Sequence, residues 1–227
     1  MEIEMEVQIR NSELIEQLDG FINDFYAIEG FDDPVFHMYD PKDARENGIL
    51  YTSEEYLHKQ MALGSKHTGF PEQHFSQPVG QMAQRNPDQF ADVAFRVRKK
   101  FPEVLGVHSS ALFNYYPPGG FVGWHTNWNA NAYQILFTWS KTGDGYFRYW
   151  DNQEKKIVHI EDKPGWQCRW YYFGREDEPD YHCWHAAYAG CDRFTLAYKF
   201  VNDKIGTDKD RQAIIMRDQL IEEIEEE

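Results

Sequence analysis

The stretch from Val107 to Val201 constrains the fold more than any other part of the chain. Apolar and polar residues alternate along it, aromatic side chains are frequent, and sequences typical of turns interrupt it. These turn sequences are Pro117-Pro118-Gly119-Gly120, Gly143-Asp144-Gly145, Pro164-Gly165, Glu178-Pro179 and Gly190. Alternation with a period of two is typical of strands that bury one face. The stretch therefore predicts five or six short strands in an antiparallel β-barrel or two-sheet sandwich.

Apolar residues at helical spacing predict helices on both sides of this β core. A chain of 227 residues is long enough to bury one large core, so we predict a single α+β domain over residues 1–227. In it, residues 1–106 form a helical and irregular flank, 107–201 the β core and 202–227 a C-terminal helix. The individual helices are expected at residues 11–28, 53–63, 89–101 and 208–227.

Two parts of the flanks leave alternatives open. Residues 30–78 contain irregular stretches rich in Gly and Pro, and they form either a lid over a site or a segment packed against the β core. The apolar stripe of the C-terminal helix must be buried against the β core or against a second copy of the chain, which would make a dimer.

Composition limits the compartment and the partners. The formal net charge of −15 opposes nonspecific binding to nucleic acid or to an anionic membrane, although it leaves room for a local basic groove. The basic cluster at residues 96–100 is expected on a solvated helix face. Three cysteines without a CxxC pair predict no disulfide framework. With an acidic N-terminal sequence and no apolar run of membrane-spanning length, we expect a cytoplasmic protein.

Residues 114–127 carry the first candidate site residues. Side chains alternate between the two faces of an extended strand, so His125 and Asn127 should project from one face and Thr126 from the other. A His-x-carboxylate pair on one strand, together with a distant histidine, forms the two-histidine, one-carboxylate site of non-haem Fe(II) oxygenases. The sequence therefore predicts a metal site in which Asn127 stands where a carboxylate is expected.

His185 is the predicted second histidine. His182 lies close to it in the sequence, but the two would lie on opposite faces of an extended strand. Only His185 is followed at a useful distance by Arg193-Phe194-Thr195, in which the cation and the hydroxyl share a strand face and can bind a carboxylate. This pairing favours His185.

These motifs resemble those of the Fe(II)/2-oxoglutarate-dependent dioxygenase superfamily, over roughly residues 107–201. The family has an HxD motif, a later histidine and an Arg-x-Ser/Thr pair. Asn114-x-Tyr116-x-x-Gly119 followed by His125 is similar to its nucleic-acid dealkylase branch, and Tyr-Pro-Pro-Gly-Gly-Phe is similar to prolyl-hydroxylase-like members.

The resemblance implies a double-stranded β-helix, the jelly-roll or cupin-like fold, which binds Fe(II) through His125, Asn127 and His185. It implies hydroxylation of a C–H bond with release of succinate and CO2. We expect a protein side chain or a small metabolite as substrate, and a nucleobase-directed oxidative demethylase is the alternative. The implied 2-oxoglutarate-binding residues are Asn114, Tyr116, Arg193 and Thr195. The expected walls of the substrate space are Trp124, Trp128 and Trp139.

Asn127 departs from the Asp or Glu of this family, and a neutral amide is a weaker iron ligand than a carboxylate. In a first interpretation Asn127 binds through its carbonyl oxygen, or Asp144 or Asp151 substitutes, and the protein is an active oxygenase. In a second, the open position admits another ligand such as a halide. In a third, metal binding is weak and the chain is an inactive binding or scaffold protein.

A structural zinc site is an alternative of a different class. Its ligands would be His182, Cys183, His185 and Cys191, which are more crowded than the usual paired spacing.

Overall fold

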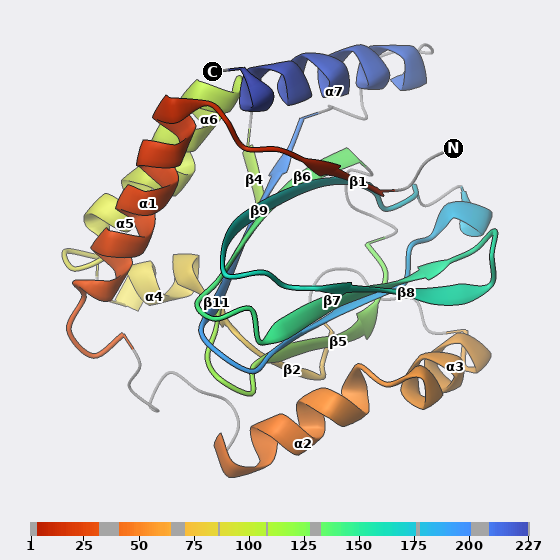
Figure 1. The fold of residues 1–227 in the computed structure, drawn as a ribbon. Helices are drawn as coiled ribbons and strands as arrows, with labels where there is room; N and C mark the ends of the chain where they lie inside the picture. The colour runs from red at the N-terminus through yellow and green to blue at the C-terminus, as the bar shows by residue number, and fades with distance from the viewer. Residues whose placement is uncertain are drawn as a thin grey trace.

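The computed structural model describes residues 4–31, 41–64, 71–85, 87–107, 109–127, 133–175, 178–200 and 209–226. Two antiparallel sheets lie face to face, and helices cover the outer face of each sheet (Figure 1). The α+β class predicted from the sequence is therefore confirmed. None of the helices in these ranges is long and apolar enough to cross a membrane.

The larger sheet has the strand order β1-β9-β6-β11-β4-β3 and the smaller sheet β2-β5-β10-β7-β8. The larger sheet consists of β1 (Glu4–Val7), β3 (Gln77–Pro78), β4 (Ser109–Tyr116), β6 (Tyr133–Ser140), β9 (Gly165–Tyr172) and β11 (Arg193–Lys199). The smaller sheet consists of β2 (His74–Phe75), β5 (Phe121–His125), β7 (Gly145–Asp151), β8 (Lys156–Glu161) and β10 (His185–Ala189). Strands β4 to β11 thus divide equally, with β4, β6, β9 and β11 in one sheet and β5, β7, β8 and β10 in the other.

For residues 107–201 the sequence predicts five or six strands, whereas the residues that the structure describes contain eight, β4 to β11. One reason is the turn between β7 and β8, which contains neither Gly nor Pro. There the Asp151 carboxylate accepts hydrogen bonds from the backbone N–H groups of Gln153 and Glu154, and Lys155 adopts a positive φ of 52°. A side chain therefore makes this turn, which a search for Gly and Pro does not detect.

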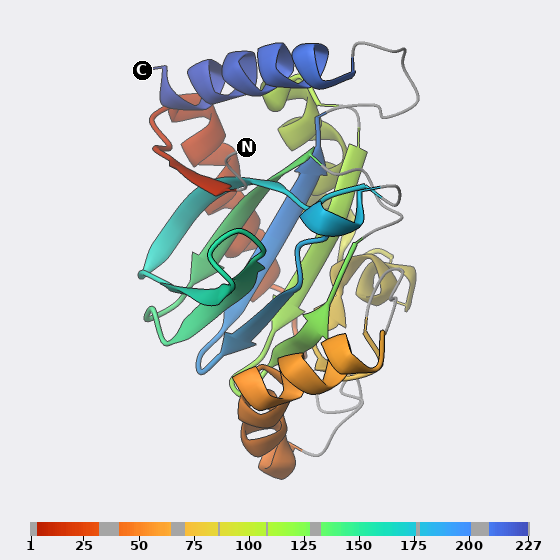
Figure 2. The same ribbon diagram turned by 90° about the vertical axis from the view of Figure 1, so that its right-hand side faces the viewer.

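The main core lies between the larger sheet and one group of helices (Figure 1; Figure 2). This group consists of α1 (Ser12–Tyr26), α4 (Val79–Arg85), α5 (Ala91–Phe95), the π-helical turn η2 (Arg96–Lys100), α6 (Phe101–Leu105) and α7 (Lys209–Glu225). Phe21 and Phe25 of α1 place their ring centroids 5.3 and 4.7 Å from that of Phe194 on β11. Full burial of each ring contributes about 1.5–3 kcal/mol, which holds the larger sheet against α1.

The ends of the chain join this core. Asn11 caps α1, with its side-chain oxygen accepting from Leu14 N–H at 2.9 Å. Leu220 and Ile224 of α7 are buried in the main core, and the Ile224 carbonyl accepts from the Arg10 and Asn11 N–H groups. The C-terminal part of the α7 stripe is therefore buried against its own chain, whereas Ile214 and Ile215 of the same stripe are exposed.

The helical run before the β core differs from the prediction in two respects. Pro102 does not end it, because it lies in the first turn of α6, and the helix continues to Gly106, which has φ 62°. The π-helical turn η2 directly precedes α6. Its backbone hydrogen bonds span five residues instead of four, which changes the α-helical pattern that a proline would otherwise interrupt. Arg96 is only partly exposed, because its guanidinium donates to Asp24 and Gln17 of α1.

The described part of residues 30–78 packs against the smaller sheet. Its helices are α2 (Pro41–Tyr51), which the sequence pattern does not predict, and α3 (Glu54–Ala62), whose N-cap is Ser53. Both lie against β5 (Figure 2), and Leu57 of α3 is fully buried there. Of the two alternatives, a lid over a site or a segment packed against the β core, the described residues of this segment show the packing against a sheet.

A β-bulge in β5 decides which of its side chains face the space between the sheets. His185 pairs with His125 and Ala187 pairs with Val122, so two residue steps on β10 match three on β5. Without the extra residue, strict alternation would send Val122 and His125 to opposite faces. The bulge places both on the inner face and turns Trp124 outward, toward Leu57.

Gly123→Ala should disturb this bulge. A Cβ at Gly123 would lie 2.9 Å from the Gln73 carbonyl oxygen, so the backbone would have to shift at a cost of about 1–3 kcal/mol. Chemical denaturation measures the loss. Gly80→Ala is the matched control, because its Cβ would meet only the end of the Arg98 side chain at 3.4 Å. Equal stability of the two variants would show that the bulge does not depend on Gly123.

Candidate functional site

The structure brings the three predicted metal-binding residues together on the inner side of the smaller sheet. His125 ends β5 and His185 begins β10, and the two are paired across these strands. Their ring centroids lie 4.1 Å apart. Asn127 follows β5, and its side-chain nitrogen lies 3.4 Å from Nε2 of His185. Both histidines are buried.

Backbone carbonyl groups fix the orientation of both imidazoles. Nδ1 of His125 lies 2.9 Å from the Gly123 oxygen, and Nδ1 of His185 lies 2.9 Å from the Cys183 oxygen. A carbonyl can only accept, so each Nδ1 carries a hydrogen and each Nε2 of the neutral ring keeps a lone pair. A hydrogen bond of this kind orients a histidine for metal binding through Nε2.

Aromatic side chains surround His185 and keep it neutral. Its ring centroid lies 4.6 Å from that of Phe173 and 5.8 Å from that of Phe147. Burial among these rings lowers the pKa of His185 from 6.5 to about 4, although the hydrogen bond to Cys183 opposes the shift. At neutral pH the ring is therefore unprotonated, which is the form that binds a metal.

Within the described residues, no other His, Cys, Asp or Glu completes a three-ligand cluster with these histidines. The predicted substitution by Asp144 or Asp151 is thus wrong for this structure, because Asp151 caps the β7–β8 turn and Asp144 lies against Gly190. The alternative zinc cluster also does not form there. His182, one of its proposed ligands, instead bonds the Arg175 carbonyl.

The four predicted cosubstrate residues form one block on neighbouring strands. Arg193 pairs with Tyr116, and Thr195 pairs with Asn114, across β11 and β4. The Arg193 guanidinium lies 5.1 Å from the centroid of the Tyr116 ring. Burial raises the pKa of Tyr116, and the Arg193 charge only partly offsets the shift, so the phenol remains protonated.

Arg193 is buried and has a partner that the sequence reading missed. Its Nε donates to Oδ2 of Asp162 at 2.8 Å, and its Nη1 donates to the Thr195 hydroxyl at 2.7 Å. Burial alone would lower the pKa of Arg193, but the Asp162 carboxylate, together with Tyr116 and Tyr171, outweighs it and the pKa is raised. Asp162 follows β8 and has no motif of its own, so only the pairing of the strands reveals this contact.

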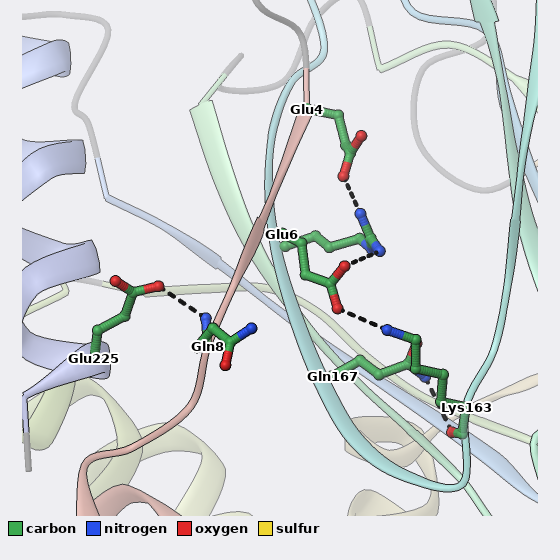
Figure 3. A network of polar contacts seen from close by, with 7 residues as sticks. Glu4, Glu6, Gln8, Lys163, Gln167 and Glu225 are labelled. Atoms are coloured by element: carbon green, nitrogen blue, oxygen red, sulfur yellow. Dashed lines mark hydrogen bonds and ion pairs between the residues drawn. The ribbon is translucent and has the colours of Figure 1, made fainter.

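Arg193 and Asp162 line a cavity of about 20 Å³ between the sheets, which is large enough for about one water. Phe147, which contacts His185, also lines it. A second arginine of the lining, Arg169, is held by Glu4 and Glu6 of β1, and Glu6 also bonds Lys163 (Figure 3). The cavity and the histidine pair therefore share one aromatic wall.

One polar atom of this block has no hydrogen-bond partner among the residues that the structure describes. Asn114 is fully buried, and its side-chain nitrogen donates to Ser76 at 2.8 Å, while its oxygen has no hydrogen bond. Turning the amide over would let the Ser76 hydroxyl donate to that oxygen and would leave the nitrogen without a partner instead. In either orientation one end of the amide lacks a partner, as expected for a residue that contacts a ligand.

The expected tryptophan walls are wrong for the residues that the structure describes. Trp124 lies on the outer face of the smaller sheet, where its indole donates to the Ser53 carbonyl at 2.8 Å. Trp139 packs on the outer face of the larger sheet, against the main core. Trp128 lies outside the described residues. The side chains that surround His185 are instead Phe147 and Phe173.

Comparison with known proteins finds no matching family model and no matching curated protein. Among solved structures, the chain is similar to a prolyl-4-hydroxylase from Pseudomonas putida, with 13% identity and a TM-score of 0.30 over 80% of this chain and 98% of that one. It is similar to the ribosomal oxygenase YcfD from Escherichia coli, with 14% identity and a TM-score of 0.32 over 71% of this chain and 49% of that one.

A third similar structure is a dioxygenase for auxin oxidation from Arabidopsis thaliana bound to 2-oxoglutarate, with 14% identity and a TM-score of 0.34 over 86% of this chain and 81% of that one. The chain spans about half the length of the ribosomal oxygenase, 49%. These TM-scores are too low to establish a shared fold or function, so the proposal below rests on the geometry of the site.

The burial of His185 predicts a pH dependence of stability in the metal-free protein. Its pKa is about 4 when folded against 6.5, so the unfolded chain takes up the proton first as the pH falls. The resulting stabilisation is complete above pH 6.5 and is lost between pH 6.5 and 4, at a cost of about 3 kcal/mol. The free energy of unfolding, measured by denaturation from pH 7.5 to 4, reports the loss.

His185→Gln is the reference variant for this measurement. Its side chain does not titrate, whereas the carboxylates that titrate in the same range are common to both proteins. The stability difference between the native protein and the variant should therefore change by about 3 kcal/mol over this range. Parallel pH profiles would show that His185 is not held neutral by burial.

Proposed function

We propose that this chain is an Fe(II)/2-oxoglutarate-dependent oxygenase with a jelly-roll core, which hydroxylates a C–H bond of a protein side chain or small metabolite. The observation that carries the proposal is the pair of buried histidines, His125 and His185, whose Nδ1 atoms are held by carbonyl groups, so that Nε2 is the nitrogen with which each ring would bind a metal. The equal division of β4 to β11 between two sheets supports the jelly-roll.

The residues present fit a divalent cation. Two neutral imidazoles are suitable ligands for Fe(II), and the Asn127 amide already contacts Nε2 of His185. In the metal-free protein the amide nitrogen donates to that lone pair. Turning the amide over would direct its oxygen there instead, so that His125, His185 and Asn127 would hold the metal.

The neighbouring block fits a small organic acid. Arg193 and Thr195 offer a cation and a hydroxyl, and one end of the Asn114 amide lacks a hydrogen-bond partner among the described residues. These residues lie on the inner face of the larger sheet, as do Leu136 and Ala197 of the inner core. They would hold the distal end of 2-oxoglutarate, while its oxo-acid end would lie toward the histidines.

When bound, the iron and the 2-oxo acid supply the oxygen chemistry, with succinate and CO2 as the products from 2-oxoglutarate. The chain's own residues orient the reactants and exclude water. Phe147 and Phe173 surround His185, and Tyr171 stacks on Phe173 with ring centroids 5.3 Å apart. This low-dielectric wall strengthens the electrostatic interactions of the site.

The formal net charge of −15 supports a protein or metabolite substrate over nucleic acid. A nucleobase-directed demethylase remains the alternative that the Asn114-x-Tyr116 motif suggests. Salt-sensitive binding to single-stranded DNA would favour that alternative.

A second candidate function is binding without catalysis. Two observations favour it, since Asn127 supplies no negative charge to the metal and Arg193 is already paired with Asp162. In this case the jelly-roll core would serve as an inactive binding or scaffold protein.

Asn127→Asp separates the two candidates. Changes to groups that only support the ligands alter metal affinity by about 10–100-fold, so this change of a ligand should tighten Fe(II) binding by at least about tenfold. Anaerobic titration with Fe(II) and 2-oxoglutarate measures the binding through the visible charge-transfer band of the chelate. Succinate release without added substrate measures turnover. An oxygenase gives both signals in the native protein, and His125→Ala removes them.

Two other outcomes would contradict the oxygenase proposal. If the native protein gives neither band nor succinate and Asn127→Asp gives both, the native chain is the inactive binding protein. If neither protein binds Fe(II), the metal site itself is wrong.

A further inference from the structure

The arginines that line the cavity between the sheets are already paired with carboxylates of the chain. Arg193 is bonded to Asp162, and Arg169 is bonded to Glu4 and Glu6 of β1. Figure 3 shows Glu4 and Glu6 side by side along β1, with Lys163 bonded to Glu6. A pocket that binds a carboxylate through charge presents a cation in excess, whereas here each arginine has an internal counterion.

Asp162 occupies the edge of Arg193 that best suits a carboxylate. Its two oxygens lie 2.8 Å from Nε and 3.5 Å from Nη2 of Arg193, which is a side-on, two-point contact. The remaining terminal nitrogen, Nη1, donates to Thr195. An incoming carboxylate would meet the outer N–H groups of Nη1 and Nη2 only, with Asp162 on the same guanidinium.

The fold holds Asp162 in this position. Its backbone N–H donates to the Gly145 carbonyl at 3.0 Å, and its side chain is only 4% exposed. Gly145 makes the approach possible, because a Cβ there would lie 2.6 Å from Oδ2 of Asp162. Asp162 is therefore a built-in counterion rather than a surface residue that meets Arg193 by chance.

We infer that Asp162 is a specificity-determining residue of this site. By compensating the charge of Arg193, it makes a distal carboxylate bind little better than an uncharged amide of the same shape. The inference rests on the proposed function in one respect, namely that the Arg193 cavity receives the distal end of the cosubstrate. The physical reason is the repulsion between two carboxylates on one guanidinium in a buried site, which cancels most of the attraction to Arg193.

Metal-free protein tests this inference with two probes, glutarate and glutaramate, in which an amide replaces one carboxylate. Calorimetric titration at matched ionic strength should give similar affinities for the two probes in the native protein. In Asp162→Asn, glutarate should bind about tenfold or more tightly than glutaramate, because the full charge of Arg193 is released. The double variant with Arg193→Gln should lose this preference.

Asp180→Asn is the matched control, since it removes the same charge from an exposed position and should leave the native pattern unchanged. Asp162→Asn should also unfold at a lower temperature, and glutarate should restore its Tm while glutaramate should not. If the variant does not fold alone, recovery of folded protein in glutarate and not in glutaramate gives the same answer.

Three results would overturn the inference. These are a preference of the native protein for glutarate of about tenfold, a lack of preference in Asp162→Asn, and a lack of glutarate binding by that variant. Because neither iron nor turnover enters this measurement, its failure is distinguishable from failure of the oxygenase proposal, which the Fe(II) titration decides.

Discussion

The inner faces of the two sheets are buried against each other, and the architecture of the site follows from this constraint. Helices pack on the outer face of the larger sheet and over β5 of the smaller sheet, while Lys156, His159 and Glu161 of β8 are exposed. A polar group placed between the sheets is therefore removed from water and must find a partner in the protein or in a ligand. The inner space is where the chain places its histidines, its buried arginine and the Asn114 amide.

Each of these polar groups meets this requirement in a different way. Both histidines donate from Nδ1 to backbone carbonyls, and burial keeps His185 neutral, so its Nε2 is left as an acceptor or a metal ligand. Arg193 cannot become neutral and is instead paired with Asp162. Breaking such a buried pair by removing one partner costs about 3–5 kcal/mol, so Asp162 stabilises the fold while it limits what Arg193 can bind.

The two departures from the expected oxygenase site are related through charge. Asn127 lacks the negative charge expected beside the metal, and Asp162 adds one beside the cosubstrate anchor. A site loaded with Fe(II) and a dicarboxylate would thus carry the same formal charge as one with an Asp ligand and an uncompensated arginine. The negative charge lies at the other end of the pocket, where it affects cosubstrate selectivity rather than the metal.

Local sequence by itself determined several of the helices, the strand character of the β core and the identity of the candidate residues. Period-two alternation, helix caps such as Asn11 and the motif residues of β4, β5, β10 and β11 could be read directly, because they depend on neighbours along the chain. The tertiary structure alone decided which strands are paired, where the β5 bulge turns His125 inward and Trp124 outward, and that Asp162 reaches Arg193. Those features arise from contacts between residues far apart in the sequence. In a pair of strands, a one-residue change of register moves every side chain of a strand to the other face of the sheet.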